Sequence, residues 1–354
     1  MKRKLPIPLL ILIDLVLLGG ALCVYALFHH VIPRVEVDLS QQTGPQPKPP
    51  TQIGAPADTD PVKTSPIDTD PIGPADTDPV DTAGTQTSPP VTTEPAETEP
   101  PGPFTQGEII STETLYQSED ICVTLTKYSR PYAGEGQPPS VFYVQDVRVR
   151  YVENLKTAFA KDQYGKNITE WTKTIADRKG AVAALSGDFY GLRSTGVVIR
   201  DGVLYRDKPD DDVLVMYSDG SMKVIAKKEF NGEQAIAEGA YQAWCFGPSL
   251  MDENGKAKSE FPGCRITYWN PRAAIGYVEP GHYVFLFAEG RTEDARGLRM
   301  ELLAQIMEEM GCVVAYNLDG GQSASMYFDG EIVGTPCEGG RPVSDIIYIA
   351  EIEK

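Results

Sequence analysis

Short apolar runs separated by tight turn signals fill residues 104–354 and limit the folds that this part of the chain can form. Five pairs of the Asp-Gly, Asn-Gly or Pro-Gly type adjoin such runs: Asp201-Gly202, Asp219-Gly220, Asn254-Gly255, Pro280-Gly281 and Asp329-Gly330. These pairs favour the backbone of hairpin turns, and hairpins join neighbouring strands that run in opposite directions. We therefore predict a strand-rich domain built on an antiparallel or mixed sheet.

Helical periodicity is clear in one place. Apolar residues recur at helical spacing between Leu298 and Met310, and Gly311 follows as a C-terminal cap. A second helix is expected at 155–162 or at 168–178. The fold class predicted for 104–354 is therefore α+β, a single strand-rich, mixed-sheet domain with a few helices.

Residues 40–103 have almost nothing to bury. They are rich in Pro, Thr, Asp and Glu, and Asp-Thr-Asp-Pro recurs from Asp58, Asp68 and Asp76. Such a segment cannot offset the entropy lost on ordering, so we expect an extended, disordered linker.

The first 39 residues have the pattern of a membrane anchor. Lys2, Arg3 and Lys4 precede an apolar segment, residues 5–28, which is long enough to cross a bilayer as a helix. The pattern lacks a convincing small-residue cleavage site and so favours an uncleaved signal anchor. We expect a single-pass protein in the cell membrane with an extracytoplasmic C-terminal domain.

The charge balance argues against nucleic acid as a partner. The formal net charge is −18, and segments 1–39 and 40–103 contribute +1 and −8, which leaves about −11 for 104–354. Proteins that bind nucleic acid usually present a basic face that displaces counterions from phosphates.

Five of the six cysteines follow the apolar N-terminal segment, and none are spaced as in a zinc site. In an oxidising compartment a disulfide between Cys245 and Cys264 is the pairing we expect, with buried free thiols as the alternative. His282 is the one histidine beyond residue 30. A Ser-His-Asp site or a zinc site with several histidine ligands is therefore not favoured.

The most informative stretch is Asn317-Leu318-Asp319-Gly320-Gly321-Gln322-Ser323-Ala324-Ser325, which follows the apolar run 312–316. The run is short and β-branched and is typical of a buried strand. Two glycines let backbone N–H groups approach a ligand such as phosphate, and Ser323 adds a hydroxyl. A carboxylate among these donors suits acid–base chemistry, a sugar hydroxyl or a metal ion. A tight turn whose side chains bond their own backbone is the alternative.

Four further stretches place polar residues at the ends of apolar runs. Ser186-Gly187-Asp188 follows one such run, and the loop could converge with the Asp319 loop on one site. Arg272 enters a strand directly after a proline, and its guanidinium could hold phosphate or carboxylate as a rigid fork. The other two stretches are Glu289-Gly290-Arg291-Thr292 and Gly340-Arg341-Pro342-Val343-Ser344-Asp345.

Taken in order, these stretches resemble the phosphodiester glycosidase family. The similarity runs from about residue 181 to the C-terminus, and the anchor and linker indicate a bacterial, membrane-anchored member. The resemblance implies an extracytoplasmic hydrolase that cleaves sugar-1-phosphodiesters, of the N-acetylglucosamine-1-phosphodiester type, at the glycosidic bond. Cell-envelope or exopolysaccharide glycans are the expected source of substrate.

The resemblance also implies roles for individual residues. Asp319, Asp188 and Glu289 are the candidates for general base, oxocarbenium stabiliser or sugar-hydroxyl ligand. Phosphate and substrate contacts fall to the residues Arg272, Arg341, Arg291, Gly320, Gly321, Ser323 and Ser186. The sequence requires no cofactor, although some of the carboxylates could hold a divalent cation.

Two positions depart from the family pattern. Ser186 stands where an asparagine is common, and Gln322 stands where a third glycine is frequent. The loss of the amide at position 186 supports an alternative, a degenerate member that binds phosphoglycans without cleaving them. A third hypothesis treats the chain as a structural envelope protein whose linker is its main feature.

Overall fold

The computed structural model describes residues 103–131 and 136–352. The predicted transmembrane helix and nearly all of the predicted linker lie outside these ranges. Within them, no helix is both long enough and apolar enough to cross a membrane.

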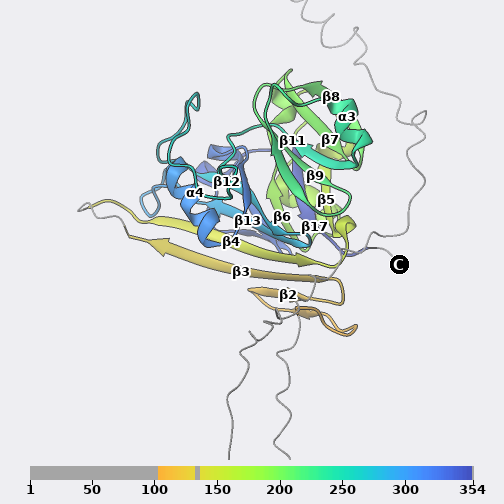
Figure 1. The fold of residues 1–354 in the computed structure, drawn as a ribbon. Helices are drawn as coiled ribbons and strands as arrows, with labels where there is room; N and C mark the ends of the chain where they lie inside the picture. The colour runs from red at the N-terminus through yellow and green to blue at the C-terminus, as the bar shows by residue number, and fades with distance from the viewer. Residues whose placement is uncertain (1–102, 132–135, 353–354) are drawn as a thin grey trace, which may run out of the picture. The chain divides into compact units, whose positions relative to one another are not determined.

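The strands of the described chain form three antiparallel sheets (Figure 1). The largest has seven strands in the order β1-β2-β3-β4-β13-β12-β14. Its strands are β1 (Ile110–Ser111), β2 (Leu115–Gln117), β3 (Ile121–Arg130), β4 (Ser140–Val149), β12 (Arg272–Glu279), β13 (His282–Ala288) and β14 (Val314–Asn317).

Two five-stranded sheets accompany it, in the orders β16-β15-β6-β17-β5 and β10-β9-β11-β7-β8. The strands of the first are β5 (Leu155–Phe159), β6 (Ala183–Ser186), β15 (Met326–Phe328), β16 (Glu331–Val333) and β17 (Asp345–Ile349). The strands of the second are β7 (Gly196–Arg200), β8 (Val203–Lys208), β9 (Val213–Tyr217), β10 (Met222–Ile225) and β11 (Ala240–Trp244).

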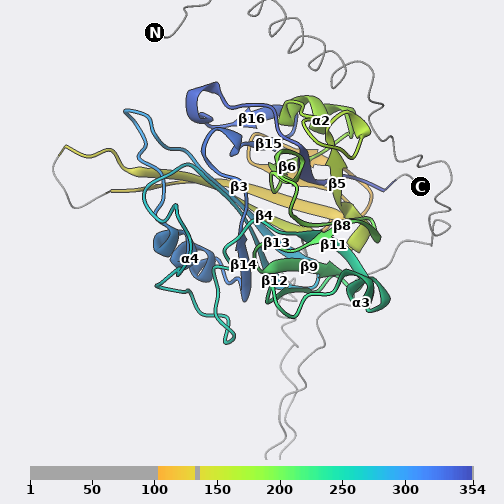
Figure 2. The same ribbon diagram turned by 90° about the horizontal axis from the view of Figure 1, so that it is seen from above.

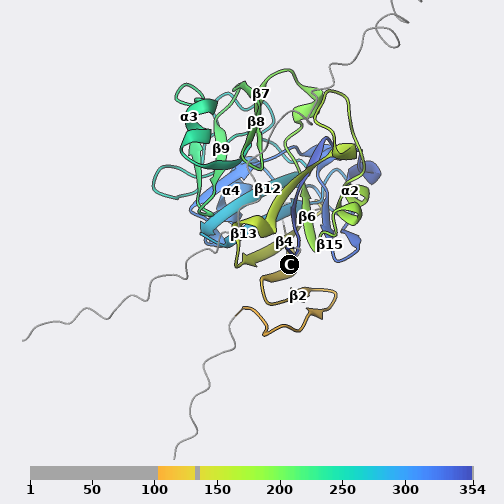
Figure 3. The same ribbon diagram turned by 90° about the vertical axis from the view of Figure 1, so that its right-hand side faces the viewer.

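The described α-helices are short and lie on the outer faces of the sheets. They are α2 (Thr172–Arg178), α3 (Gly232–Ala237) and α4 (Met300–Glu309). Figures 2 and 3 show α2 and α3 on separate sides of the molecule, each beside one of the two smaller sheets. Turns of 3-10 helix complete the described elements: η3 (Val152–Asn154), η4 (Ala160–Asp162), η5 (Tyr190–Leu192), η6 (Gly321–Ser323) and η7 (Cys337–Gly339).

The seven-stranded sheet is covered on both faces because its central strands are apolar at successive positions. On β13, Val284 and Leu286 pack towards α4, whereas Phe285 and Phe287 join the core shared with the smaller sheets. Successive strand residues point to opposite faces of the sheet. An apolar run such as 283–288 therefore places apolar side chains on both faces, and both faces must be covered. At roughly 25 cal/mol per Å² of apolar surface, burial on both faces is the main stabilising term of this layer.

The predicted hairpins are confirmed. Asp201-Gly202 joins β7 to β8, Asp219-Gly220 joins β9 to β10, and Pro280-Gly281 joins β12 to β13. Asp329-Gly330 joins β15 to β16, and a bridge between Met251 and Ala257 closes the turn at Asn254-Gly255. The predicted helix before Gly311 is α4, and the second one is α2.

The structure rejects one of the two ranges expected for the second helix, and it rejects the mixed sheet. Residues 155–159 form β5 rather than a helix, because β5 pairs with β17 along its whole length. The sheets are antiparallel rather than mixed, since all pairings between the described strands are antiparallel. The connection from β13 through α4 to β14 makes β13 and β14 parallel to each other. They are not neighbours, because β12 lies between them and runs opposite to both.

The predicted disulfide is also wrong. Cys245 and Cys264 are free, as are Cys122, Cys312 and Cys337. The Sγ atom of Cys245 is buried after β11 and lies 3.4 Å from Oδ1 of Asp210. Cys264 lies on the loop that precedes β12 and is partly exposed.

Candidate functional site

The site forms where the ends of four strands meet. Asn317, the last residue of β14, pairs with Ala274 near the start of β12, and Ser186, the last residue of β6, pairs with Ile346 near the start of β17. The Asp319 N–H donates to the Gly187 carbonyl at 3.3 Å and joins the two loops. Loops from two sheets are thereby brought together, as the sequence predicted for the stretches around Asp188 and Asp319.

The two glycines of the Asp319 loop pack against the start of β12. A Cβ atom on Gly320 would lie 2.7 Å from the Pro271 carbonyl oxygen, so the loop has room only for glycine there. Gly321 has a φ of +61° and donates its N–H to the same carbonyl at 3.0 Å. The Gly321 amide is therefore committed to Pro271, and close packing of the loop on β12 is the main reason for the glycine pair.

Asp319 shares this loop with two polar partners. Its Oδ2 accepts a hydrogen bond from Nη2 of Arg341 at 3.1 Å, and Nε of Arg341 donates to Oγ of Ser323 at 2.5 Å. Burial raises the pKa of Asp319 above the ordinary aspartate value, and the Ser323 hydroxyl and the Arg341 guanidinium oppose that rise. A carboxylate with these properties is suited to take up a proton during a reaction.

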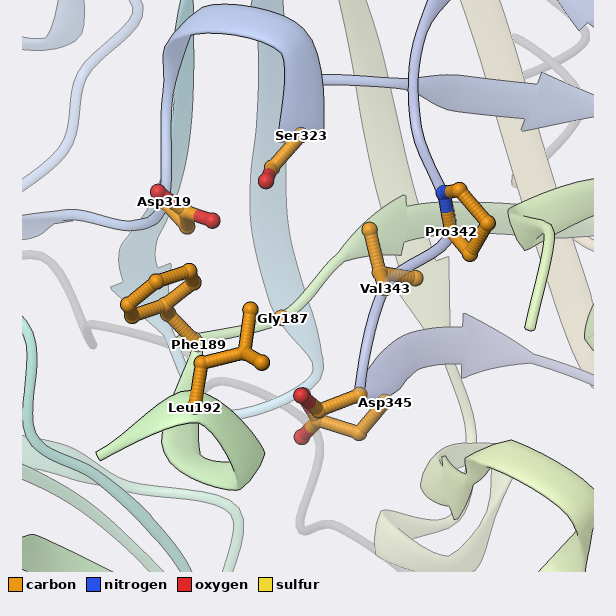
Figure 4. A pocket seen from close by; sticks show the side chains of 9 residues that line it. Gly187, Phe189, Leu192, Asp319, Ser323, Pro342, Val343 and Asp345 are labelled. Atoms are coloured by element: carbon orange, nitrogen blue, oxygen red, sulfur yellow. The ribbon is translucent and has the colours of Figure 1, made fainter. Parts of the chain in front are cut away.

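A small recess of about 10 Å³ lies beside Asp319. In Figure 4 the Asp319 and Ser323 side chains face each other on one side of this recess, and Asp345 lies on the other side. Phe189 and Leu192 add apolar walls, and Phe189 has a left-handed φ of 65° that turns the chain after β6. The recess has room for about one water molecule and is far too small for a sugar ring.

Asp345 belongs to a buried cluster with Asp188 and Arg200. The Arg200 Nη2 atom lies 2.6 Å from Oδ2 of Asp345 and 3.4 Å from Oδ1 of Asp188. Burial raises the pKa of Asp345 to about 6, with Arg200 opposing the rise and Asp188 adding to it. The second oxygen of Asp345 is buried without a hydrogen-bond partner in the described chain. A Cβ atom on Gly187 would lie 2.1 Å from it, so glycine is needed at 187 to make room for the carboxylate.

A larger cleft, of about 640 Å³, also borders the Asp319 loop. Asp319, Gly320, Gly321 and Gln322 form part of its wall. Its cationic lining residues are Lys227, Arg265, Arg272, Arg291 and Arg341, and its other acidic ones are Asp210, Asp211 and Asp212. The predicted arginines and Asp319 thus share one cleft, whose size suits a small-molecule ligand.

Arg272 is the buried member of this cationic set. Its Nε donates to the Leu298 carbonyl, and its Nη2 donates to the carbonyls of Ile266 and Tyr268 at 2.9 and 2.7 Å. Burial lowers the pKa of Arg272 to about 10, so the side chain is cationic at neutral pH. Its hydrogen bonds within the described chain go to carbonyls and to no carboxylate, which leaves a positive charge at the wall of the cleft.

Arg291 is exposed and lies opposite the glycine loop. Its Nη2 donates to Oδ1 of Asn270 at 2.6 Å, and its Nη1 would lie 3.6 Å from a Cβ atom on Gly321. The residue adopts a left-handed φ of 59°. A non-glycine residue in this conformation is uncommon, and such positions concentrate at functional sites.

The structure does not bring Glu289, Ser186 or Asp188 into the cleft. Glu289 is buried after β13, where its Oε1 accepts hydrogen bonds from the Tyr143 hydroxyl and the Thr335 amide. The Ser186 hydroxyl is buried and accepts from the Ser325 amide at 3.3 Å. The Asp188 carboxylate accepts hydrogen bonds from the Arg200 guanidinium and from the Cys245 amide. Each carboxylate or hydroxyl is therefore occupied by the fold itself, and direct substrate contact by these three residues is not supported by their position.

Sequence reasoning did not select Asp345 or Arg265. Asp345 closes the Arg341 stretch and opens the apolar strand β17. A carboxylate at the first position of a fully buried strand is a signal that could have identified it. Arg265 lies in a Pro- and Gly-containing loop with no comparable signal, and its place on the cleft depends on the path of that loop.

Among the residues that the structure describes, no group of three or more His, Cys, Asp and Glu side chains is arranged to hold a metal ion. The expected possibility of a divalent cation remains a prediction.

The fold and the site define a class: a strand-rich antiparallel domain with an acid and several arginines gathered at one set of strand ends. Residues 179–350 match the family described as phosphodiester glycosidase. This part of the chain belongs to that family.

Two curated relatives place the match in context. The uncharacterised, SPbeta prophage-derived protein YomE of Bacillus subtilis (strain 168) is 29% identical over 203 residues, which cover 53% of this chain and 30% of that protein. The N-acetylglucosamine-1-phosphodiester α-N-acetylglucosaminidase of Mus musculus is 32% identical over 73 residues, 21% of this chain and 14% of that one. The chain thus spans less than a third of the length of these curated relatives.

A solved structure shares the fold. The catalytic domain of zebrafish N-acetylglucosamine-1-phosphodiester α-N-acetylglucosaminidase, auto-inhibited by its pro-peptide, superposes with a TM-score of 0.52. The match covers 66% of this chain and 84% of that chain at 16% sequence identity. At this identity the likeness is one of fold.

Proposed function

We propose that this protein hydrolyses sugar-1-phosphodiesters at the glycosidic bond. The observation that carries the proposal is the cleft itself, in which Asp319 lies beside Arg341 and within the same walls as Arg272 and Arg291. Membership of residues 179–350 in the phosphodiester glycosidase family supports it.

The chemistry follows from the charges in the cleft. A phosphodiester is an anion, and its departure as a phosphomonoester increases the negative charge on the phosphate. Arginine forks stabilise such charge best when they are already oriented, as Arg272 is by three carbonyls.

Asp319 is assigned the role of general base. Water attacks the anomeric carbon, the bond from that carbon to the phosphate oxygen breaks, and the electron pair leaves with the phosphate. The proton lost by the water passes to the Asp319 carboxylate. The raised pKa of Asp319 favours this uptake of a proton, and a good leaving group removes the need for a strong acid.

The expected setting is the outer side of the cell membrane. The apolar segment 5–28 and the Pro- and Thr-rich segment 40–103 support an anchor and a linker, and a linker of this length would let the domain reach a layer of envelope glycans. Cell-envelope or exopolysaccharide phosphodiesters are therefore the proposed substrates.

An isotope experiment tests the bond that is cleaved. The full-length chain is incubated with benzyl N-acetylglucosamine-1-phosphate in water enriched in oxygen-18, and both products are analysed by mass spectrometry. Cleavage at the anomeric carbon places the label in the sugar and leaves the benzyl phosphate without label. Label in the phosphate would instead define a phosphodiesterase and overturn the proposal, and the Asp319→Asn variant controls for a contaminating hydrolase.

A phosphoglycan-binding protein without activity is the second candidate, favoured by Ser186 at a position where the family pattern often has asparagine. Calorimetry that detects binding of the diester, with no product after long incubation, would support it. If the Ser186→Asn variant then gains activity, the serine at this position accounts for the inactivity of the wild type.

A further inference from the structure

A second hollow, the Tyr164 hollow, shares no lining residue with the cleft. It measures about 440 Å³ and is formed by residues 164–166, by residues 190–194 and by the β8 residues 205–208. The strand β8 is the last strand of its sheet, and β5, whose end Phe159 contacts Tyr205, is the last strand of another. The hollow therefore lies beside the contact of two sheet edges, and its size is in the range of small-molecule sites.

Tyrosine rings form one wall of the Tyr164 hollow. Tyr164 stacks on Tyr190 with ring centroids 5.4 Å apart, and the ring of Tyr205 lies 4.9 Å from that of Tyr164. Tyr190 is buried, whereas Tyr164 and Tyr205 are partly exposed in the lining. A tyrosine ring has an apolar face and a polar edge, which suits a sugar ring with its C–H face and its rim of hydroxyl groups.

Three cations accompany these rings. Arg206 is partly buried, and its guanidinium donates to the carbonyls of Arg193 and Tyr190, both at 2.9 Å. Its Nε atom is buried without a hydrogen-bond partner in the described chain. Lys166 and Lys208 are exposed. None of the three cations forms an ion pair with a carboxylate among the described residues.

This local charge is opposite to that of the whole domain, because residues 104–354 carry a net negative charge. Among the described residues that line the hollow, Asp207 is the acidic one, and its Oδ2 atom already accepts the Gly232 N–H at 2.9 Å. The three cations are therefore left for an external anion, and a guanidinium held by carbonyls is oriented before the anion arrives.

We propose that the Tyr164 hollow is a second, non-catalytic site that binds an acidic sugar residue of a glycan, with its acid group at Arg206 and its ring against Tyr164 and Tyr205. Phosphate and carboxylate are the two sources of such acidity, and both match a guanidinium fork. The inference goes beyond the proposed function, because it requires neither hydrolysis nor any residue of the cleft. A site of this kind holds the domain on an acidic glycan whether or not the cleft is occupied.

Hydrogen exchange locates the ligand on the full-length chain. The probes are phosphorylated maltotetraose, a hyaluronan tetrasaccharide, which carries carboxylates, and unmodified maltotetraose. An acidic probe should slow amide exchange in residues 163–167 and 203–208, whereas occupation of the cleft would appear in residues 262–272 and 317–322. The more protective of the two acidic probes identifies the acid group. No protection of the hollow by either acidic probe, or equal protection by unmodified maltotetraose, would overturn the proposal.

Two double variants with the same change of charge test the cations. Lys166→Gln combined with Lys208→Gln should raise about tenfold the probe concentration that half-protects residues 203–208. Lys223→Gln combined with Lys228→Gln, at exposed positions outside the hollow, should change it less than twofold. Equal effects of the two double variants would attribute binding to net charge and reject the site, as would an unchanged concentration in the first.

The ring contact is tested at Tyr164. Tyr164→Leu removes the aromatic face and should weaken binding about fivefold, whereas Tyr164→Phe keeps the face and should retain most of the affinity. Equal affinity of the leucine variant and the wild type would remove the ring from the site. Thermal unfolding of each variant checks that the domain is folded.

Nucleic acid is another polyanion that aromatic rings and cations bind. Three cations around one hollow fall short of an extended basic face, so an oligothymidylate should need at least tenfold higher concentration than the acidic tetrasaccharide to protect residues 203–208. Protection by the oligothymidylate at a similar or lower concentration would overturn the proposal in favour of a nucleic-acid site.

Discussion

Two clusters of acidic side chains with an arginine lie at the same strand ends, one around Arg341 and one around Arg200. They differ in their access to solvent. Asp319 and Arg341 have side-chain exposures of 13% and 37%, whereas the side chains of Asp188, Arg200 and Asp345 are 1%, 3% and 1% exposed. Residue types are alike in the two clusters. The difference lies in burial. The partly exposed Asp319–Arg341 pair can exchange its contacts for a ligand, whereas the buried cluster around Arg200 holds the sheets together.

The buried cluster joins the two smaller sheets. Arg200 ends β7, and it binds Asp345 at the start of β17 and Asp188 after β6, besides the carbonyls of Ile199 and Ala243. Removing one partner from such a network leaves an uncompensated buried charge, which is strongly destabilising. The Asp319–Arg341 pair borders the cleft, where water or a substrate can replace either partner at small cost.

Replacement of Arg200 should have the largest effect on folding. Arg200→Met leaves two buried carboxylates without their cation, and we expect a loss of about 3 to 5 kcal/mol in the free energy of unfolding, measured by urea denaturation at pH 7.5. The matched change Arg341→Met should cost less than about 1 kcal/mol. Similar losses in the two variants would remove the distinction between the clusters.

Asp319→Asn should have the largest effect on catalysis. Loss of the proton acceptor is expected to lower kcat by about 10³-fold on the benzyl diester, while the free energy of unfolding changes by less than about 1 kcal/mol. Asp188→Asn is the comparison, because it weakens the partner of Arg200 and should act mainly on stability. A variant of Asp319 that loses stability but keeps its activity would assign the loop a structural role.

Gly187→Ala should cost about 1 to 3 kcal/mol of stability, because the added methyl group would overlap the Asp345 carboxylate, 2.1 Å from its Cβ position. The overlap is tested by repeating the substitution in an Asp345→Ala background. If the clash is the cause, the cost of Gly187→Ala falls in that background; an unchanged cost would show that overlap with the Asp345 carboxylate is not the cause.

The smallest expected effect is on the pH dependence of stability. Asp345 loses its proton near 3.8 in the unfolded chain and near 6 in the folded one, so between these values the folded state binds more protons. The contribution of this group is fully present below pH 3.8 and is lost as the pH rises through 6. Since one proton is involved, the free energy of unfolding should fall by no more than about 1.4 kcal/mol for each pH unit.

Urea unfolding at half-unit steps from pH 4 to 7 measures this slope. Asp345→Asn should flatten it, because asparagine carries no titrating proton, whereas Glu331→Gln on an exposed strand position should leave it unchanged. Identical slopes in the wild type and Asp345→Asn would show that Asp345 does not titrate in this window.

Local features of the fold were predictable because they depend on residues close together in the chain. The turn pairs at 201–202, 219–220, 280–281 and 329–330 lie between the strands that they were expected to join. The β5 strand was not predictable in this way. Its residues are compatible with a helix, and pairing with β17, about 190 positions later, decides their conformation.

The same distinction between local and distant contacts applies to the candidate site. The sequence by itself determined the Asp319 loop, the arginines at 272, 291 and 341, and the family to which residues 179–350 belong, because these are motifs of contiguous residues. Tertiary structure alone decided that Asp319 opens on the cleft while Asp188 and Glu289, which also follow apolar strands, are enclosed. Whether a carboxylate at a strand end meets solvent or a buried partner depends on the strand packed against it, and that strand is set by contacts between distant parts of the chain.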